Sequence, residues 1–153
     1  MAWLAWLENT AFSAWVRGAG SLWAYPTILT LHTVGLSVLV GANVVLALVI
    51  LGWARGVPLA PLQLLFRFMW AGFAVNAVSG MALFAADATT KAAQPVFLVK
   101  LALITLGIAN ISLLRPDLSR ETQGVSARGK AFAVASIVIW AGAITAGRLM
   151  AYL

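Results

Sequence analysis

Apolar residues run along the chain in four long stretches that short polar segments separate. The stretches cover residues 22–53, 62–86, 95–114 and 131–152. Each is at least as long as the ~20 apolar residues that a helix needs to cross a bilayer, and the first is longer than a bilayer needs. The pattern therefore predicts an all-α protein, an integral membrane four-helix bundle in a single transmembrane domain.

The segment before the first span, residues 2–18, has a different pattern. Polar Glu8, Asn9 and Arg17 interrupt its apolar character. Its apolar residues recur at helical spacing, at Trp3, Leu7, Ala11–Phe12 and Trp15. Tryptophan anchors helices at the membrane–water boundary. We predict a short N-terminal interfacial amphipathic helix here. A cleavable signal peptide is not expected, because no basic segment precedes the apolar residues.

The composition agrees with a membrane protein and excludes several other classes. The chain is 63% hydrophobic and 9% charged, whereas soluble domains carry about 25% charged residues. The net charge of +6 comes from basic residues that stand singly between apolar stretches, so they form no continuous nucleic-acid-binding stripe. The chain has no cysteine, which excludes disulfides and thiolate metal sites.

The basic residues outside the spans, together with Arg67 close to the start of the second span, predict the orientation. One side of the bundle carries only Arg17 and Lys91, if Lys100 and Arg148 are set aside because they lie within spans. The other side carries Arg55, Arg67, Arg115, Arg120, Arg128 and Lys130. Cytoplasmic loops carry the excess of Lys and Arg. We therefore expect a bacterial inner-membrane protein with a cytoplasmic 115–130 loop and both termini in the periplasm.

The candidate functional residues are the only histidine, His32, and two cations within spans, Lys100 and Arg148. A charge inside a span costs about 2.5–3.5 kcal/mol on insertion scales. At ~1.5 Å per residue, His32 lies about 9 Å beyond Pro26, and Lys100 about 7–8 Å beyond Pro95. Arg148 lies at a similar depth from the other end of the chain. All three are expected in the outer half of the bilayer.

Small and polar residues follow one face of each span, and we expect these faces to meet in the bundle interior. Such residues line helix contacts in lipid because they permit close approach and hydrogen bonds. The asparagines among them are interpreted as interhelical hydrogen-bonding groups. The faces comprise Tyr25, His32, Gly35 and Asn43; Gly72, Asn76 and Gly80; Lys100, Gly107 and Asn110; and Gly142, Thr145 and Arg148, with Ser136, Trp140, Ala143 and Gly147 on a neighbouring face.

A histidine within a span can ligate haem iron or copper. The leading hypothesis is a membrane b-type haem protein, either an electron-transfer module or a subunit of a redox complex. His32 would be the axial ligand, and the propionates would point toward Lys100 and Arg148. The sixth ligand would be Met81, Met150, water or none, because bis-histidine ligation would need a symmetric homodimer.

Other functions fit the same residues. Histidine with methionine could bind copper, and the cation pair could bind a small anion. Alternatively, Lys100 and Arg148 only reach the lipid headgroups, His32 is a hydrogen-bonding core residue, and the chain is a structural accessory subunit of a larger membrane complex. Catalysis is poorly supported, because no span holds a carboxylate and the chain has no Ser–His–Asp set, two-histidine metal motif or phosphate loop.

Several dispersed segments resemble an uncharacterised bacterial four-helix inner-membrane family described as a domain of unknown function. They are LWAYPTILTLHTVGLSVLVG at 22–41, WAGFA at 70–74, SGMALFAADAT at 79–89, QPVFLVK at 94–100 and GRLMAY at 147–152. The resemblance implies that His32, Lys100 and Arg148 occupy motif positions. The family's Asp-Leu-Arg after the first span has no acidic counterpart in residues 46–55. A more distant similarity links the chain to CopD-type copper-resistance membrane proteins, which also have a histidine near a glycine in an early helix.

Overall fold

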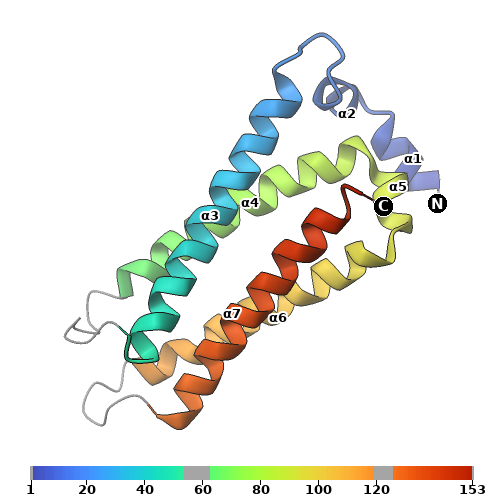
Figure 1. Cartoon of the computed structure of the whole chain (residues 1–153). Coiled ribbons are helices and arrows are strands. Elements are labelled where there is room, and N and C mark those ends of the chain that lie inside the picture. Colours follow the sequence, from blue (N-terminus) through green and yellow to red (C-terminus); the bar gives the residue numbers. More distant parts are fainter. Residues whose placement is uncertain (1, 54–62, 119–125, 153) are drawn as a thin grey trace.

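The computed structural model describes residues 2–53, 63–118 and 126–152. In this part of the chain every regular element is a helix, which confirms the all-α prediction (Figure 1). The helices are α1 (Ala2–Glu8), α2 (Ala11–Val16), α3 (Ala24–Ile50), α4 (Gln63–Ala86), α5 (Ala88–Ala93), α6 (Pro95–Leu118) and α7 (Ala127–Leu149).

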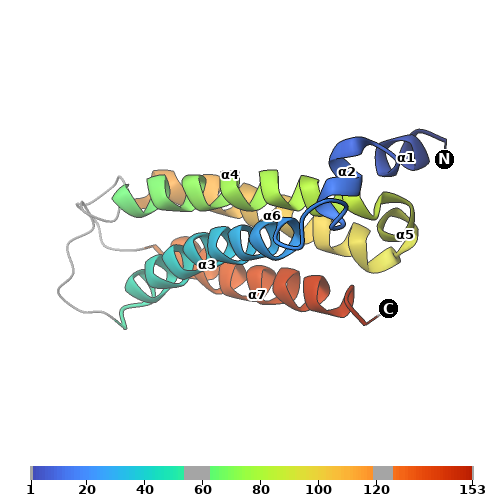
Figure 2. The same ribbon diagram turned by 90° about the horizontal axis from the view of Figure 1, so that it is seen from above.

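Four of these helices, α3, α4, α6 and α7, are long and apolar enough to cross a membrane. They form two antiparallel pairs, α3 with α4 and α6 with α7, and α3 packs against α7 to join the pairs (Figures 1 and 2). Both chain termini lie at the same end of this bundle, which we call the termini end. The predicted four-helix membrane bundle is therefore the observed architecture.

Two glycines allow α3 and α4 to approach until their backbones touch. A Cβ atom on Gly35 would lie 2.7 Å from the backbone nitrogen of Asn76, and one on Gly72 would lie 2.8 Å from the carbonyl oxygen of Gly35. Only glycine fits at such a contact. The small-residue faces predicted for the first two spans therefore do meet, as expected for helix packing in lipid.

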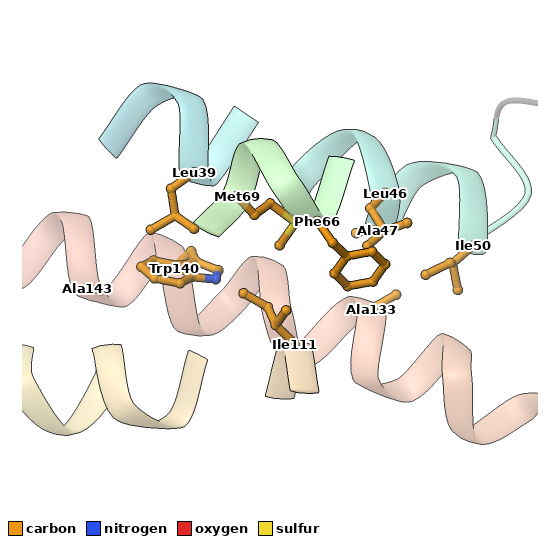
Figure 3. Packing of buried hydrophobic residues seen from close by; sticks show 10 residues of the cluster. All are labelled: Leu39, Leu46, Ala47, Ile50, Phe66, Met69, Ile111, Ala133, Trp140 and Ala143. Atoms are coloured by element: carbon orange, nitrogen blue, oxygen red, sulfur yellow. The ribbon is translucent and has the colours of Figure 1, made fainter. Parts of the chain in front are cut away.

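The apolar core lies away from the termini end, between α3, α4, α6 and α7 (Figure 3). Its largest side chain, Trp140, is 2% exposed and covers Gly107 of α6, where a Cβ atom would meet the indole ring at 3.0 Å. Ten buried residues form this cluster: Leu39, Leu46, Ala47, Ile50, Phe66, Met69, Ile111, Ala133, Trp140 and Ala143.

The asparagines predicted to connect helices do so in two of three cases. Asn43 on α3 accepts a hydrogen bond of 2.9 Å from the Ser136 hydroxyl on α7. Asn76 on α4 donates through Nδ2 to the carbonyl oxygen of His32 on α3, also at 2.9 Å. The buried Oδ1 of Asn110 has no hydrogen-bond partner among the described residues.

The N-terminal segment forms two short helices instead of the single helix predicted over 2–18. The break falls at Asn9 and Thr10, and Thr10 caps α2 because its hydroxyl accepts a hydrogen bond of 3.2 Å from the backbone amide of Ser13. Threonine is a favoured N-cap residue. The sequence therefore contained a signal for this break, because a favoured N-cap residue stands within the apolar pattern.

The polar segments are more helical than predicted. The polar segment at residues 87–94, which the hydropathy pattern predicts as a loop between the second and third spans, contains α5. Within the predicted 115–130 loop, α6 continues to Leu118, and α7 begins after Ser126, whose hydroxyl accepts a hydrogen bond from Gly129. Hydropathy marks where a helix leaves the hydrocarbon, whereas capping marks where it ends. Residues 119–125 of that loop, and Arg55, lie outside the described residues.

Candidate functional site

A cavity of about 500 Å³ lies at the termini end, between the two helix pairs. All four long helices contribute to its wall, and His32 and Lys100 both line it. Its volume falls within the roughly 300–1,000 Å³ typical of small-molecule and cofactor sites. The cavity is therefore the candidate functional site, in the region where the sequence predicted one.

The backbone of α4 holds the imidazole ring of His32. Its Nδ1 atom lies 3.0 Å from the carbonyl oxygen of Asn76 and 3.1 Å from the hydroxyl oxygen of Ser79. The Ser79 hydroxyl lies 2.6 Å from the carbonyl oxygen of Val75, to which it donates. Because a carbonyl oxygen only accepts, the hydrogen-bond network assigns the ring proton to Nδ1. The lone pair of the neutral imidazole is then on Nε2.

Among the described residues, the donor near that lone pair is the side-chain amide of Asn76. The Nδ2 atom of Asn76 lies 3.3 Å from Nδ1 and 3.4 Å from Nε2 of His32, almost equally far from both. Both distances exceed the roughly 2.7–3.2 Å that is usual for a hydrogen bond with a nitrogen donor, so the contact at Nε2 is weak. The same NH2 group, which has two hydrogens, also donates to the His32 carbonyl oxygen at 2.9 Å. Gly80 provides room for the ring, since a Cβ atom there would lie 3.1 Å from Cε1.

Lys100 crosses from α6 to the wall formed by α7. Its Cε and Nζ atoms lie 3.5 Å from where a Cβ atom of Gly147 would be, so the absence of a side chain at Gly147 leaves room for the lysine. Among the described residues, the Lys100 ammonium makes no hydrogen bond and no ion pair. A half-buried and unpaired ammonium in a cavity is suited to an anionic ligand group.

Two charged residues that sequence reasoning did not assign to the site, Glu8 and Arg17, line the termini end of the cavity. Arg17 donates through Nη1 to the carbonyl oxygens of Glu8 and Ala86, both at 2.8 Å, so its charge lies at the C-terminus of α4. The Glu8 carboxylate accepts from the backbone amide of Thr89 at 3.1 Å and from its hydroxyl at 2.6 Å. These contacts hold α1 and α2 over the ends of α4 and α5.

Two further contacts complete the wall. Lys91 of α5 donates to the carbonyl oxygen of Met150 at 3.3 Å and pairs with Asp87 at 3.7 Å. Phe84 of α4 and Phe97 of α6 stack with ring centroids 5.1 Å apart and planes 8° from parallel. The aromatic pair joins two helices that otherwise make little direct contact.

The structure brings His32 and Lys100 to one cavity but places Arg148 outside it. The Arg148 side chain is exposed and does not line the cavity. Met150 is on the cavity wall, whereas Met81 is 63% exposed and is not. The inward face of α7 carries Ser136, Trp140 and Ala143. It is the neighbour of the face predicted to turn inward with Arg148.

The contact between Glu8 and Thr89 predicts a pH dependence of stability. The hydrogen bonds from the Thr89 hydroxyl and then its backbone amide hold the pKa of Glu8 below its ordinary value of 4.5. A lowered folded-state pKa stabilises the fold above 4.5, and this stabilisation is lost as the pH falls through the folded-state pKa. As the pH falls and Glu8 becomes protonated, we expect the wild type to lose thermal stability. Glu8→Gln, which has no carboxylate at this position, should not show this loss. Thermal unfolding in detergent between neutral pH and pH values well below 4.5 measures the difference, and parallel pH profiles would contradict it.

Among the described residues, no group of three or more His, Cys, Asp or Glu side chains is placed to hold a metal ion. Comparison of the chain with family models, with curated proteins and with solved structures finds no match. The function is therefore inferred from the geometry of the cavity.

Proposed function

We propose that the cavity binds a b-type haem, with His32 as the axial ligand of the iron. The observation that carries this proposal is the hydrogen bonding of His32. Its Nδ1 lies 3.0 Å from a backbone carbonyl oxygen, while the contact at Nε2 is a long one of 3.4 Å with the Asn76 amide. Histidines that bind metals usually donate their second ring N–H to a carbonyl or a carboxylate, which fixes the tautomer and the ring orientation. The His32 ring is held in this way before any ligand binds.

The surrounding donor set favours haem over a bare copper ion. A copper site needs several protein ligands, such as two histidines and a cysteine, and the described residues offer no such group. In haem, the macrocycle supplies the equatorial nitrogens, so the protein needs only one or two axial ligands. His32 provides one, and Met150 is the methionine that lines the same cavity.

The other wall residues have roles that follow from their chemistry. The Lys100 ammonium would pair with a propionate, and the stacked rings of Phe84 and Phe97 would contact the apolar macrocycle. Bound haem would supply a one-electron couple, which suits an electron-transfer module or a redox-complex subunit. In the orientation favoured by the basic residues, the termini end faces the periplasm of a bacterial inner membrane.

An absorption spectrum tests the proposal. Protein produced with a haem supply and purified in detergent is expected to show a Soret band that persists through size-exclusion chromatography. The apoprotein should recover the band when haemin is titrated in. A colourless protein that also fails to bind added haemin would contradict the proposed function.

Neutralising Lys100 and neutralising Arg148 should have different effects. Lys100→Met is expected to weaken haem binding by about tenfold or more, because a hydrogen bond to a charged group contributes ~1.5–3 kcal/mol and ~1.4 kcal/mol corresponds to tenfold. Arg148→Met should leave the affinity unchanged, since Arg148 is exposed outside the cavity. Haemin titration followed at the Soret band measures both variants, and equal losses in the two would contradict the assignment.

Binding of a small anion is the second candidate, favoured by the unpaired ammonium of Lys100. Inorganic phosphate is a suitable probe. If the cavity is an anion site, isothermal titration should show phosphate binding that persists in His32→Ala and is lost in Lys100→Met. A haem site instead predicts that haemin binding is lost in His32→Ala, because the iron is held by His32, and only weakened in Lys100→Met.

A further inference from the structure

Contacts between the helices border the cavity in three directions. At the termini end, Arg17 and Glu8 tie α1 and α2 to the ends of α4 and α5. Toward the other end of the bundle, the buried core around Trp140 fills the space between the helices. Between α4 and α6, the stacked rings of Phe84 and Phe97 bridge the two helices.

The fourth direction, between α3 and α7, is open. Tyr25 and Leu29 of α3 line the cavity and are nevertheless 47% and 41% exposed, and Ala151, just after α7, is exposed as well. The wall residues on α4 and α6 are half-buried or buried. In Figure 1, α3 and α7 lie close together at the end away from the termini and diverge toward the termini end. We call this opening, bordered by Tyr25, Leu29, Gly147 and Ala151, the α3–α7 window.

The window faces lipid. Leu29 follows the start of α3 at Ala24 by five residues, about 7–8 Å at ~1.5 Å per residue, and α3 is a candidate membrane span over its whole length. A molecule that passes through the window therefore comes from the bilayer. It must carry an apolar body for the cavity wall and an acidic group for the unpaired Lys100 ammonium.

We propose that the cavity takes up its ligand sideways from the bilayer, through the α3–α7 window, and that the ligand is an acidic amphiphile dissolved in the membrane. The identity of this amphiphile as haem rests on the proposed function. Haem fits the class, because its macrocycle is apolar and its propionates are acidic. The contacts of Glu8 and Arg17 then hold α1 and α2 at the termini end while the ligand enters.

Single cysteines can test the route, because the chain has none of its own. Leu29→Cys places a thiol at the window. Leu98→Cys is the matched control, since Leu98 is 63% exposed, does not line the cavity and, like Leu29, follows a proline by three residues. Thr90→Cys, on the exposed side of α5, reports on entry from water. Each variant is labelled with a bulky maleimide and compared with itself before labelling.

Uptake of haemin from phosphatidylcholine vesicles is the measured rate. Labelling Leu29→Cys is expected to slow uptake by about tenfold or more, as blocking an obligatory gate does. Labelling Leu98→Cys or Thr90→Cys should leave the rate unchanged. Labelling Leu29→Cys after loading should retain the haem and slow its release. Three outcomes would each overturn the proposal. Labelled Leu29→Cys and Leu98→Cys could take up haemin at equal rates, or labelling could slow uptake in Thr90→Cys alone. The third is that labelling Leu29→Cys after loading expels the bound haem.

A second measurement separates this proposal from the haem proposal. In haem-free protein, Met150→Cys puts a thiol on the cavity wall at a position that is only 9% exposed. It should react faster with a maleimide dissolved in the lipid than with a water-soluble, membrane-impermeant one, and the reverse order would overturn the window. Failure of every unlabelled protein to bind haemin would contradict only the proposed function.

Discussion

His32→Ala is expected to abolish the Soret band of the purified protein. The imidazole is the only histidine ligand in the chain, and the variant removes it without disturbing the glycine contacts that hold α3 against α4. Mutation of residues that merely orient a metal ligand costs about 10–100-fold in affinity, so loss of the ligand itself should exceed this range. Haemin titration of the apoprotein measures the loss.

The effect of His32→Ala can be assigned to ligation by two controls. Added imidazole should restore a Soret band in His32→Ala, because the substitution leaves room for a free ring between α3 and α4. Ser79→Ala, which removes one of the two contacts at Nδ1, should weaken binding but keep the band. An unchanged Soret band in His32→Ala would show that the iron, if bound, is held by another residue.

The sequence predicted the spans well because their signal is local. Hydropathy averaged over a span identifies a helix in lipid, and the small-residue faces around Gly35 and Gly72 identified the face along which α3 meets α4. The similar depth of His32 and Lys100 was predictable, because depth in the membrane follows from counting residues along a helix. The structure brings both side chains to one cavity. These inferences use only neighbouring positions in the chain.

The remaining features depend on contacts that are distant in sequence. Arg17 reaches the end of α4, 69 residues away, and Glu8 caps α5 from 81 residues away. No periodicity within α1 or α5 indicates these partners. The rotation of α7 about its axis was similarly ambiguous, because two adjacent faces carried small residues. The partner helices decide between the two faces, and they turn Arg148 outward.

The contact between α3 and α4 also determines the orientation of His32. Gly35 lies three residues beyond His32 on α3, and a Cβ atom there would approach the backbone nitrogen of Asn76. The carbonyl oxygen of that same residue is the one near Nδ1 of His32. The distance between the two backbones therefore decides whether the imidazole keeps its tautomer and its direction. Stability and ligand binding should change together when this contact is altered.

Gly35→Ala is expected to destabilise the protein and to weaken ligand binding. The added methyl group would lie 2.7 Å from the Asn76 nitrogen and 2.9 Å from the Gly72 carbonyl oxygen. Both are backbone atoms, so the two helices must separate. Overpacking of this kind costs about 1–3 kcal/mol. Thermal unfolding in detergent and haemin titration should both register the change.

Gly41→Ala is the matched control on the same helix. Gly41 is exposed, and a Cβ atom there would have no neighbour within 4 Å. Alanine is the better helix former by about 1 kcal/mol, so this variant should be as stable as the wild type or slightly more stable, with unchanged haemin affinity. Equal stabilities for Gly35→Ala and Gly41→Ala would show that α3 and α4 do not touch at Gly35. A destabilised Gly35→Ala with full affinity would show instead that the orientation of His32 does not depend on that contact.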